Sequence, residues 1–179
     1  MSMQYGVDVA SQRLDDLDKR VLAAVERMVS AGASPRVLDV GCGHGGLSVA
    51  LAAAGATVVA VDIDDYGDVI HGHSASYTDS IDFIQADIRD WVTTNTECFD
   101  LVVLQRVLHY LSYKDVQMVL EKLHAVSDRL YLSVTGATTA IANHYGALKE
   151  PITERWGRLN VAGQELFSIA APLCLYTES

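Results

Sequence analysis

Asp39 and the three glycines that follow it at alternate positions, Gly41, Gly43 and Gly45, are the residues whose spacing most clearly serves chemistry. Glycine adopts positive φ and lacks a Cβ atom, so the backbone of such a loop can press against a ligand. With Gly46, the loop also satisfies the G-x-G-x-x-G pattern of dinucleotide sites. A carboxylate just before the loop would repel a pyrophosphate and attract an ammonium or sulfonium group. The spacing therefore indicates a binding site for a ligand that carries positive charge.

The elements that would position this loop alternate between strands and helices. The strands that apolar runs predict are 36–40, 57–61, 81–85, 99–104 and 129–134, and the helices that apolar spacing predicts are 14–29, 47–54 and 112–126. Nearly continuous apolar strands between helices indicate a parallel sheet covered on both faces. We therefore expect an α/β fold, a doubly wound, mainly parallel sheet with an N-terminal helix. Ligands of such sheets bind beyond the carboxyl ends of the strands, where the Asp39 loop falls.

The run Val37-Leu-Asp-Val-Gly-Cys-Gly-His-Gly-Gly-Leu47 resembles the first motif of class I S-adenosylmethionine-dependent methyltransferases. The resemblance implies a Rossmann-like methyltransferase fold, S-adenosylmethionine as the cofactor and S-adenosylhomocysteine as the product. The residues that it assigns to the cofactor in this loop are Asp39, Gly41, Cys42, Gly43 and Gly45, with Cys42 contributing only its backbone. An alternative from the residues alone is that Asp39 caps the turn, as Asp often does.

The end of the second strand extends the resemblance. Asp62 lies 23 positions after Asp39, where this family places an acid that accepts hydrogen bonds from both ribose hydroxyls. Ile63 beside it is assigned to the cofactor as well. Asp62 could instead be an ordinary turn acid in a run of aspartates, and Asp64 is then the next candidate for the ribose.

Two later segments complete the resemblance, which covers about residues 36–134. Asp87 and Ile88 resemble the pair that reads adenine, with the carboxylate taking the exocyclic amine and the next backbone N–H a ring nitrogen. Asp87 could instead be a plain helix N-cap. The run from Phe99 to Leu111 resembles the fourth strand and the turn beside the transferable methyl, which assigns Gln105 to the cofactor.

Catalytic and substrate-binding residues are less clear from the sequence. Arg106 could bind an anionic group of the substrate or pair with a surface acid, and His109 could be packed in the core or act as a base. The segment 141–156 gathers residues suited to a small molecule, among which Tyr145 and His144 are candidates for substrate contact or catalysis. The alternative is a solvated pair of helices.

Composition narrows the class of partner. Thirteen Lys and Arg against 23 Asp and Glu give a net charge of −10 and a pI near 4.8. This charge opposes binding to nucleic acid or to an anionic membrane surface, so we expect a small-molecule substrate. No apolar run reaches the roughly 18 residues of a membrane span, and the first residues do not resemble a signal peptide.

Cysteine and histidine spacing predicts neither disulfides nor a metal site. Cys42, Cys98 and Cys174 form no metal-ligand spacing and no even disulfide framework, which suggests a reducing cytoplasm. His71 and His73 lie in a polar loop without a third ligand, so no metal is expected.

We expect a single methyltransferase-like domain over 1–179, with an N-terminal helical segment (1–35), a cofactor-binding core (36–134) and a substrate-side helical segment (135–179). The family normally continues with a helix and a hairpin that supplies strands six and seven, so the chain is expected to be C-terminally truncated. An exposed sheet edge would then favour homo-oligomers. The expected function is methyl transfer to a small molecule. The alternatives are an inactive cofactor-binding remnant that self-associates and an NAD(P)-dependent oxidoreductase.

Overall fold

The computed structural model describes residues 15–73 and 76–177. They form two compact units, which are described separately. The sheet unit comprises residues 15–73, 76–105 and 119–132. The C-terminal unit comprises residues 106–118 and 133–177. The single domain expected from the sequence stays a prediction.

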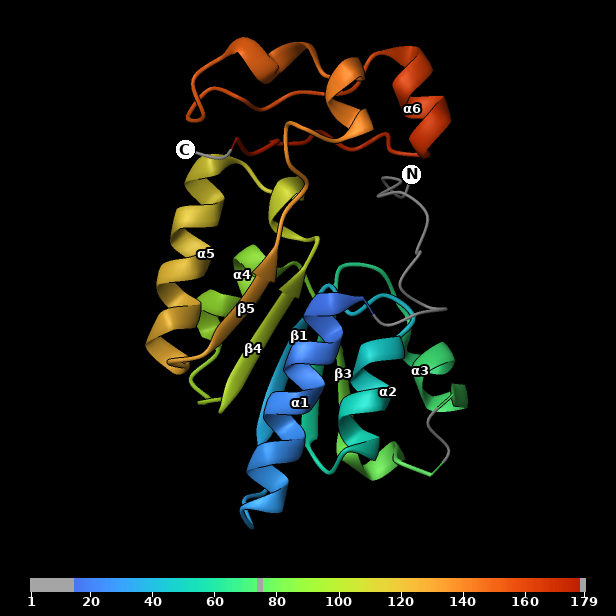
Figure 1. The fold of residues 1–179 in the computed structure, drawn as a ribbon, viewed down its shortest axis with the longest axis vertical. Coiled ribbons are helices and arrows are strands. Elements are labelled where there is room, and N and C mark those ends of the chain that lie inside the picture. The colour runs from blue at the N-terminus through green and yellow to red at the C-terminus, as the bar shows by residue number, and fades with distance from the viewer. Residues whose placement is uncertain (1–14, 74–75, 178–179) are drawn as a thin grey trace. The chain divides into compact units, whose positions relative to one another are not determined.

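The sheet unit is built on five parallel strands. They are β1 (Arg36–Val40), β2 (Thr57–Asp62), β3 (Ile81–Gln85), β4 (Leu101–Gln105) and β5 (Leu130–Ser133). Their order is β3-β2-β1-β4-β5 (Figure 1), with parallel pairing between β1 and β2, β1 and β4, and β2 and β3. This order confirms the doubly wound sheet, because the chain starts at the centre and winds outward in both directions.

Helices cover both faces of the sheet (Figure 1). The helices on one face are α1 (Asp16–Ser30), α2 (Gly46–Ala53) and α3 (Gly67–His73), and those on the other are α4 (Ile88–Thr94) and the part of α5 (Tyr113–Val126) that belongs to this unit, residues 119–126. A short 3-10 helix, Thr78–Ser80, precedes β3. None of the described helices has the length and apolar character that a membrane span requires.

Helix α1 begins with a capping box. The Asp15 side chain accepts from the backbone N–H groups of Leu17 and Asp18, and the Asp18 side chain accepts from the Asp15 N–H. Such caps satisfy N–H groups that have no partner within the helix. Val21 and Val25, one turn apart, are fully buried against the sheet. Burying a Val side chain contributes roughly 1.5–3 kcal/mol, so this face holds the helix in place.

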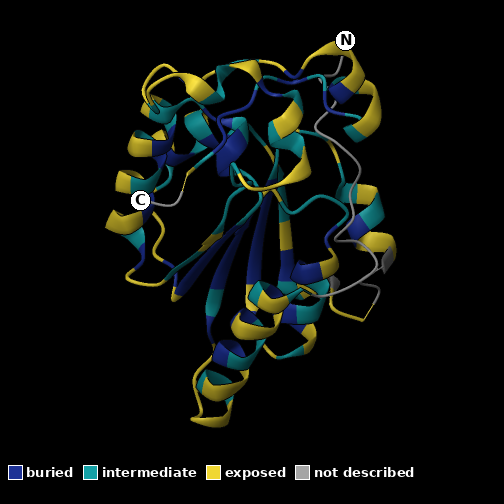
Figure 2. Cartoon of the chain, turned by 45° about the horizontal axis from the view of Figure 1, so that its top comes forward, coloured by how far each residue is buried: buried dark blue, intermediate teal, exposed yellow. Residues whose placement is uncertain are grey.

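The core between α1–α3 and the sheet consists of alternate strand residues. Val58 and Ala60 of β2 and Leu101 and Val103 of β4 all belong to it and are fully buried. Figure 2 shows the central strands in the colour of buried residues. Side chains two positions apart lie on the same face of a strand. The residue two positions after Ala60 and the residue two positions after Val103 therefore lie on this face as well.

The C-terminal unit contains the first residues of α5 (113–118), the α-helix α6 (Val161–Phe167), and 3-10 helices at Leu108–Tyr110, Ala140–His144 and Gly146–Lys149. Among the described residues after β5 there is no further strand, and isolated bridges join Gly136 to Tyr176 and Gly157 to Leu173. The apolar core of this unit consists of Tyr145, Leu159, Ile169, Leu173 and Leu175.

β5 is one edge of the sheet, and its Leu132 side chain is 41% exposed. Association of copies through this edge stays a prediction.

Candidate cofactor site

The loop between β1 and α2 requires glycine because of its backbone conformation and its close packing. Gly41, Gly43 and Gly45 have φ values of 69°, 51° and 78°, which is the left-handed region. A Cβ atom at Gly45 would lie 2.5 Å from Cγ1 of Ile70, a fully buried side chain. Gly45 is also the N-cap of α2 and supplies no side-chain hydrogen bond. The loop therefore presents backbone, rather than side chains, at the start of α2.

The end of β2 fixes this loop in place. The backbone N–H groups of Gly41 and Cys42 donate to the carbonyl oxygen of Val61, at 2.7 and 3.3 Å. The N–H of Gly43 donates to Oδ2 of Asp62 at 2.9 Å. The first turn of the loop is thus determined by β2 as well as by its own sequence.

Three polar side chains come after the alternate buried apolar residues of the strands, on the face of the sheet that α1–α3 cover. Asp39 is paired with Ala60 of β2 and with Val103 of β4. Asp62 comes two residues after Ala60, and Gln105 comes two residues after Val103, so both share the face of Asp39. The fold therefore brings Asp39, Asp62 and Gln105, which the sequence assigned to the cofactor, to the carboxyl ends of three adjacent strands.

Asp39 is a buried acid. Its side chain is 3% exposed, and Ser48 Oγ of α2 donates to Oδ2 at 2.6 Å. Burial raises the pKa of Asp39 to about 6, the Ser48 hydrogen bond lowers it, and the negative charges of Asp18 and Asp62 raise it further. Because desolvation and like charges both oppose the ionised form, a cationic group next to Asp39 would stabilise it.

Asp62 accepts two backbone hydrogen bonds. Besides Gly43, the N–H of Asp64 donates to Oδ1 at 3.1 Å. Burial raises the pKa of Asp62, and these N–H donors partly offset the effect. Each carboxylate oxygen retains a second lone pair, so the two oxygens can still accept from two vicinal hydroxyls. Ile63, 39% exposed, presents an apolar surface beside them.

Asp87 is the N-cap of α4. Its carboxylate accepts from the backbone N–H of Arg89 at 3.0 Å and from Arg89 Nε at 2.9 Å, and it forms an ion pair with the same guanidinium. The hydrogen bonds from the Arg89 side chain hold the pKa of Asp87 below its usual range. Ile88 is buried as the first residue of the helix. The N-cap alternative is thus present in the structure, and the adenine role of Asp87 and Ile88 stays a prediction.

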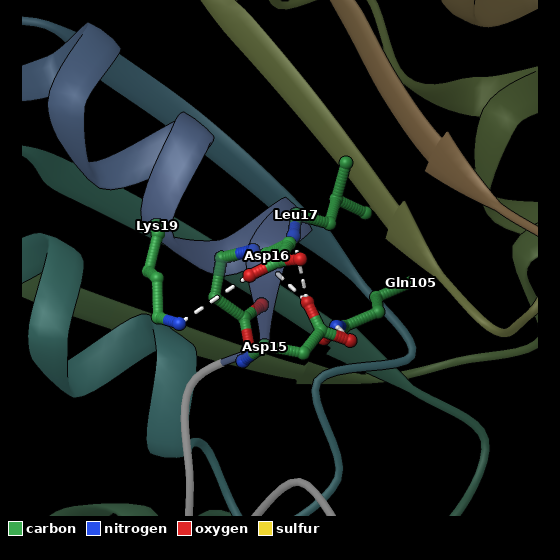
Figure 3. Close-up of polar contacts among 6 residues, drawn as sticks. Asp15, Asp16, Leu17, Lys19 and Gln105 are labelled. Atoms are coloured by element: carbon green, nitrogen blue, oxygen red, sulfur yellow. Dashed lines mark hydrogen bonds and ion pairs between the residues drawn. The ribbon is translucent and has the colours of Figure 1, made fainter.

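Sequence analysis did not identify Asp15 as part of this region. Gln105 Nε2 donates to Oδ2 of Asp15, the N-cap of α1 (Figure 3). The aspartates at 15, 16 and 18, in the first turn of the predicted helix, are a sequence signal for a helix start. No sequence signal pointed to the contact with β4.

The candidate substrate residues lie in the C-terminal unit. Arg106 has a φ of 56°, and its backbone N–H donates to the carbonyl and hydroxyl oxygens of Ser133, both at 3.1 Å. His109 is 3% exposed, and its Nδ1 has no hydrogen-bond partner within the described residues. Burial, with the positive charge of Arg106, lowers the pKa of His109 to about 4. The ring is therefore neutral at pH 7 and can accept a proton only at a considerable energetic cost.

Tyr145 holds the C-terminal unit together. Its side chain is buried, and its hydroxyl lies 2.6 Å from the carbonyl oxygen of Leu173 and 3.0 Å from that of Arg155. Burial raises the pKa of Tyr145 to about 12. His144 is half-buried, with Nδ1 3.2 Å from Oδ1 of Asn160. These contacts favour a structural role for Tyr145 over a contact with substrate.

Within the described part of the chain, no three His, Cys, Asp or Glu side chains gather as metal ligands. His71 is exposed on α3, and the side chain of His73 lies outside the described residues.

A family model described as a methyltransferase domain matches residues 37–128, just over half of the chain. A ubiquinone biosynthesis O-methyltransferase of Actinobacillus pleuropneumoniae serotype 5b (strain L20) is 40% identical over 81 residues, which are 42% of this chain and 35% of that protein. The chain spans about a third of the length of the curated relatives it matches.

Two solved structures show the same fold. A crystal structure of WbdD superposes with a TM-score of 0.60 at 25% identity, over 67% of this chain and 29% of that one. Magnesium protoporphyrin IX methyltransferase (ChlM) from Synechocystis PCC 6803, with bound SAH, gives a TM-score of 0.57 at 23% identity, over 73% of this chain and 65% of that one.

Proposed function

Because this chain belongs to the methyltransferase domain family, we propose that it binds S-adenosylmethionine and transfers the methyl group to a small-molecule acceptor. The class I members of the family use S-adenosylmethionine as the methyl donor.

The observation that carries the proposal is the arrangement of polar groups at the ends of β1, β2 and β4. Asp39, Asp62 and Gln105 each come after the buried apolar residues of their strand, on one face of the sheet and next to a glycine loop with positive φ. S-adenosylmethionine has an ammonium and a sulfonium group, two ribose hydroxyls and an adenine ring. A buried carboxylate suits the cationic end, and the Asp62 carboxylate suits the vicinal hydroxyls.

The cofactor supplies an activated methyl group on a sulfonium, so transfer is an in-line displacement. The protein has to place the acceptor atom behind that methyl and exclude water. Asp39 would hold the amino-acid end, Asp62 the ribose, and Asp87 with the Ile88 N–H the adenine. The backbone of Gly41, Cys42, Gly43 and Gly45 would contact the cofactor directly.

A small-molecule acceptor is supported by charge. At −10, the chain has no excess of cations to bind the phosphates of a nucleic acid. The relative from A. pleuropneumoniae is likewise named for ubiquinone biosynthesis. In the C-terminal unit we retain Arg106 as a candidate for an anionic substrate group and His144 as a candidate for proton transfer. His109 is not retained, because burial lowers its pKa to about 4. Tyr145 is not retained, because main-chain carbonyls occupy its hydroxyl.

We place the protein in the cytoplasm, supported by its cysteines. Cys42, Cys98 and Cys174 form no disulfide with one another, and Cys98 is exposed. A reducing compartment keeps such thiols reduced.

Calorimetric titration of the chain with S-adenosylhomocysteine, with NADH as the control, tests the cofactor. We expect saturable one-to-one binding of S-adenosylhomocysteine and no heat from NADH. Binding of NADH alone would replace the proposal with an oxidoreductase. Incubation with S-adenosylmethionine and a panel of hydroxyl, amino and thiol acceptors then tests transfer, by following S-adenosylhomocysteine release. Tight binding without release on any acceptor would favour a non-catalytic binding protein.

A further inference from the structure

The first turn of α1 meets the end of β4 through a contact between Asp15 and Gln105 (Figure 3). Oδ2 of Asp15 accepts from Nε2 of Gln105. Oδ1 of the same carboxylate accepts from the backbone N–H groups of Leu17 and Asp18, at 2.8 and 3.2 Å. Asp15 therefore caps the helix with one oxygen and holds a side chain 90 residues away with the other.

This contact determines which way the Gln105 amide is turned. A carboxylate oxygen only accepts hydrogen bonds, so the NH₂ group of Gln105 must face Asp15 and Oε1 must face away. Within residues 15–73 and 76–177, no donor to Oε1 is found. Leu104 pairs with Val40, so Gln105 lies beside Gly41, the first residue of the glycine loop. An oriented acceptor is thus available next to the loop.

The neighbouring charge also comes from α1. Asp18, the other member of the capping box, is 2% exposed, and its charge is one of the causes that raise the pKa of Asp39. Asp39 and Gln105 share one face of adjacent strands. The start of α1 therefore acts on both: on Gln105 by a hydrogen bond and on Asp39 by charge.

We propose that Asp15 is a positioning residue for the cofactor, because it holds Gln105 with Oε1 ready to accept from the ammonium group of S-adenosylmethionine. This inference rests on the proposed function. Asp39 supplies attraction without direction, whereas a side-chain amide in one orientation supplies a directed acceptor. Helix α1 then belongs to the cofactor site through its cap and is not only a cover for the sheet.

The variant Asp15→Asn tests this role. Asn caps helices as well as Asp does, so the fold is retained. Its own NH₂ group would pair with Gln105 Oε1 and withdraw that oxygen from the ligand. We expect the Kd for S-adenosylhomocysteine to rise about tenfold, the usual effect of one lost hydrogen bond to a charged group. The matched control is Asp16→Asn, which removes the same charge from an exposed neighbour that pairs with Lys19; its Kd should not change.

A second ligand separates positioning from a general loosening of the site. 5′-Methylthioadenosine has the adenine and ribose but lacks the ammonium group, so its Kd should be the same in Asp15→Asn and in the unmodified chain. In the double variant Asp15→Asn with Gln105→Glu, the NH₂ group introduced at position 15 donates to one oxygen of the carboxylate introduced at position 105. The other oxygen of that carboxylate accepts from the ligand. We expect it to bind S-adenosylhomocysteine within about threefold of the unmodified chain.

Three results are decisive. Unchanged affinity of Asp15→Asn for S-adenosylhomocysteine would overturn the inference, as would equal losses for both ligands. If Asp15→Asn unfolds, Asp15→Ser replaces it, since Ser also caps helices but is too short to hold the amide. Failure of the unmodified chain to bind S-adenosylhomocysteine would refute the proposed function itself and is thereby distinguished from failure of the inference.

Discussion

Replacing Asp62 by Ala removes two sets of contacts at once. The carboxylate accepts from the N–H groups of Gly43 and Asp64 in the structure, and in the proposed complex it also accepts from two ribose hydroxyls. A hydrogen bond to a charged group contributes about 1.5–3 kcal/mol, so loss of the two ribose hydrogen bonds should weaken binding by about 3–6 kcal/mol. The expected rise in the Kd for S-adenosylhomocysteine is roughly 100- to 10,000-fold.

The fold should tolerate this change. Burial raises the pKa of Asp62, which means that the folded protein is destabilised by its charge, and removing the charge offsets the two lost backbone contacts. The melting temperature followed by circular dichroism should therefore change little. Asp62→Asn is the conservative variant: its amide oxygen still accepts one hydroxyl, so its Kd should lie between those of the unmodified chain and Asp62→Ala.

Asp64→Ala is the matched control. It removes a neighbouring carboxylate, while the backbone N–H of residue 64 can still donate to Asp62. Its Kd, measured by the same titration, should match that of the unmodified chain. If Asp62→Ala binds normally and Asp64→Ala does not, the ribose has been assigned to the wrong aspartate.

Three further changes test other parts of the structure. Because the pKa of Asp39 is raised to about 6, its contribution to the free energy of unfolding is largest below pH 3.8 and is lost as the pH rises through 6. Asp39→Asn should therefore raise the melting temperature at pH 7 but not at pH 4, while titration shows the affinity for S-adenosylhomocysteine falling at least about tenfold at pH 7. The same raised pKa predicts that the unmodified chain binds S-adenosylhomocysteine more weakly as the pH falls below 6. Gly45→Ala combines a φ of 78° with a Cβ atom 2.5 Å from Ile70, so the free energy of unfolding measured in urea should fall by about 1–3 kcal/mol. Tyr145→Phe removes the hydroxyl near the Leu173 carbonyl and should lower stability by about 1 kcal/mol without changing the KM for an acceptor; a raised KM would restore Tyr145 as a substrate contact.

The sheet could be predicted because its strands are short, apolar and separated by helices. The resemblance to class I methyltransferases and the fold it implied are confirmed. Boundaries were less certain: β4 was expected from residue 99, but the N–H groups of Phe99 and Asp100 donate to Val126 and to Arg36 before the strand begins at Leu101. Helix α4 was not predicted as an element, because seven residues with two buried positions, Ile88 and Val92, give almost no periodicity.

Side-chain partners that are distant in the sequence could not be predicted at all. The Asp15 cap could be recognised from its local pattern, but its contact with Gln105 spans 90 residues. Tyr145 looked suited to a substrate because its surroundings were polar in the sequence. The fold instead brings the Leu173 carbonyl, 28 residues away, to its hydroxyl. The cofactor roles of Asp39, Asp62 and Gln105 remain predictions, now supported by their shared face.

The carboxylates at this end of the sheet favour one class of cofactor by repelling another. Asp18 and Asp62 both raise the pKa of Asp39, so their negative charges already act on one another. A pyrophosphate bound at the glycine loop would add further negative charge to them, whereas the ammonium and sulfonium of S-adenosylmethionine would reduce the repulsion. Selectivity that rests on repulsion of the wrong ligand weakens when the repelling charge is removed. Neutral variants of these aspartates should therefore lose affinity for S-adenosylhomocysteine and reject NADH less strongly.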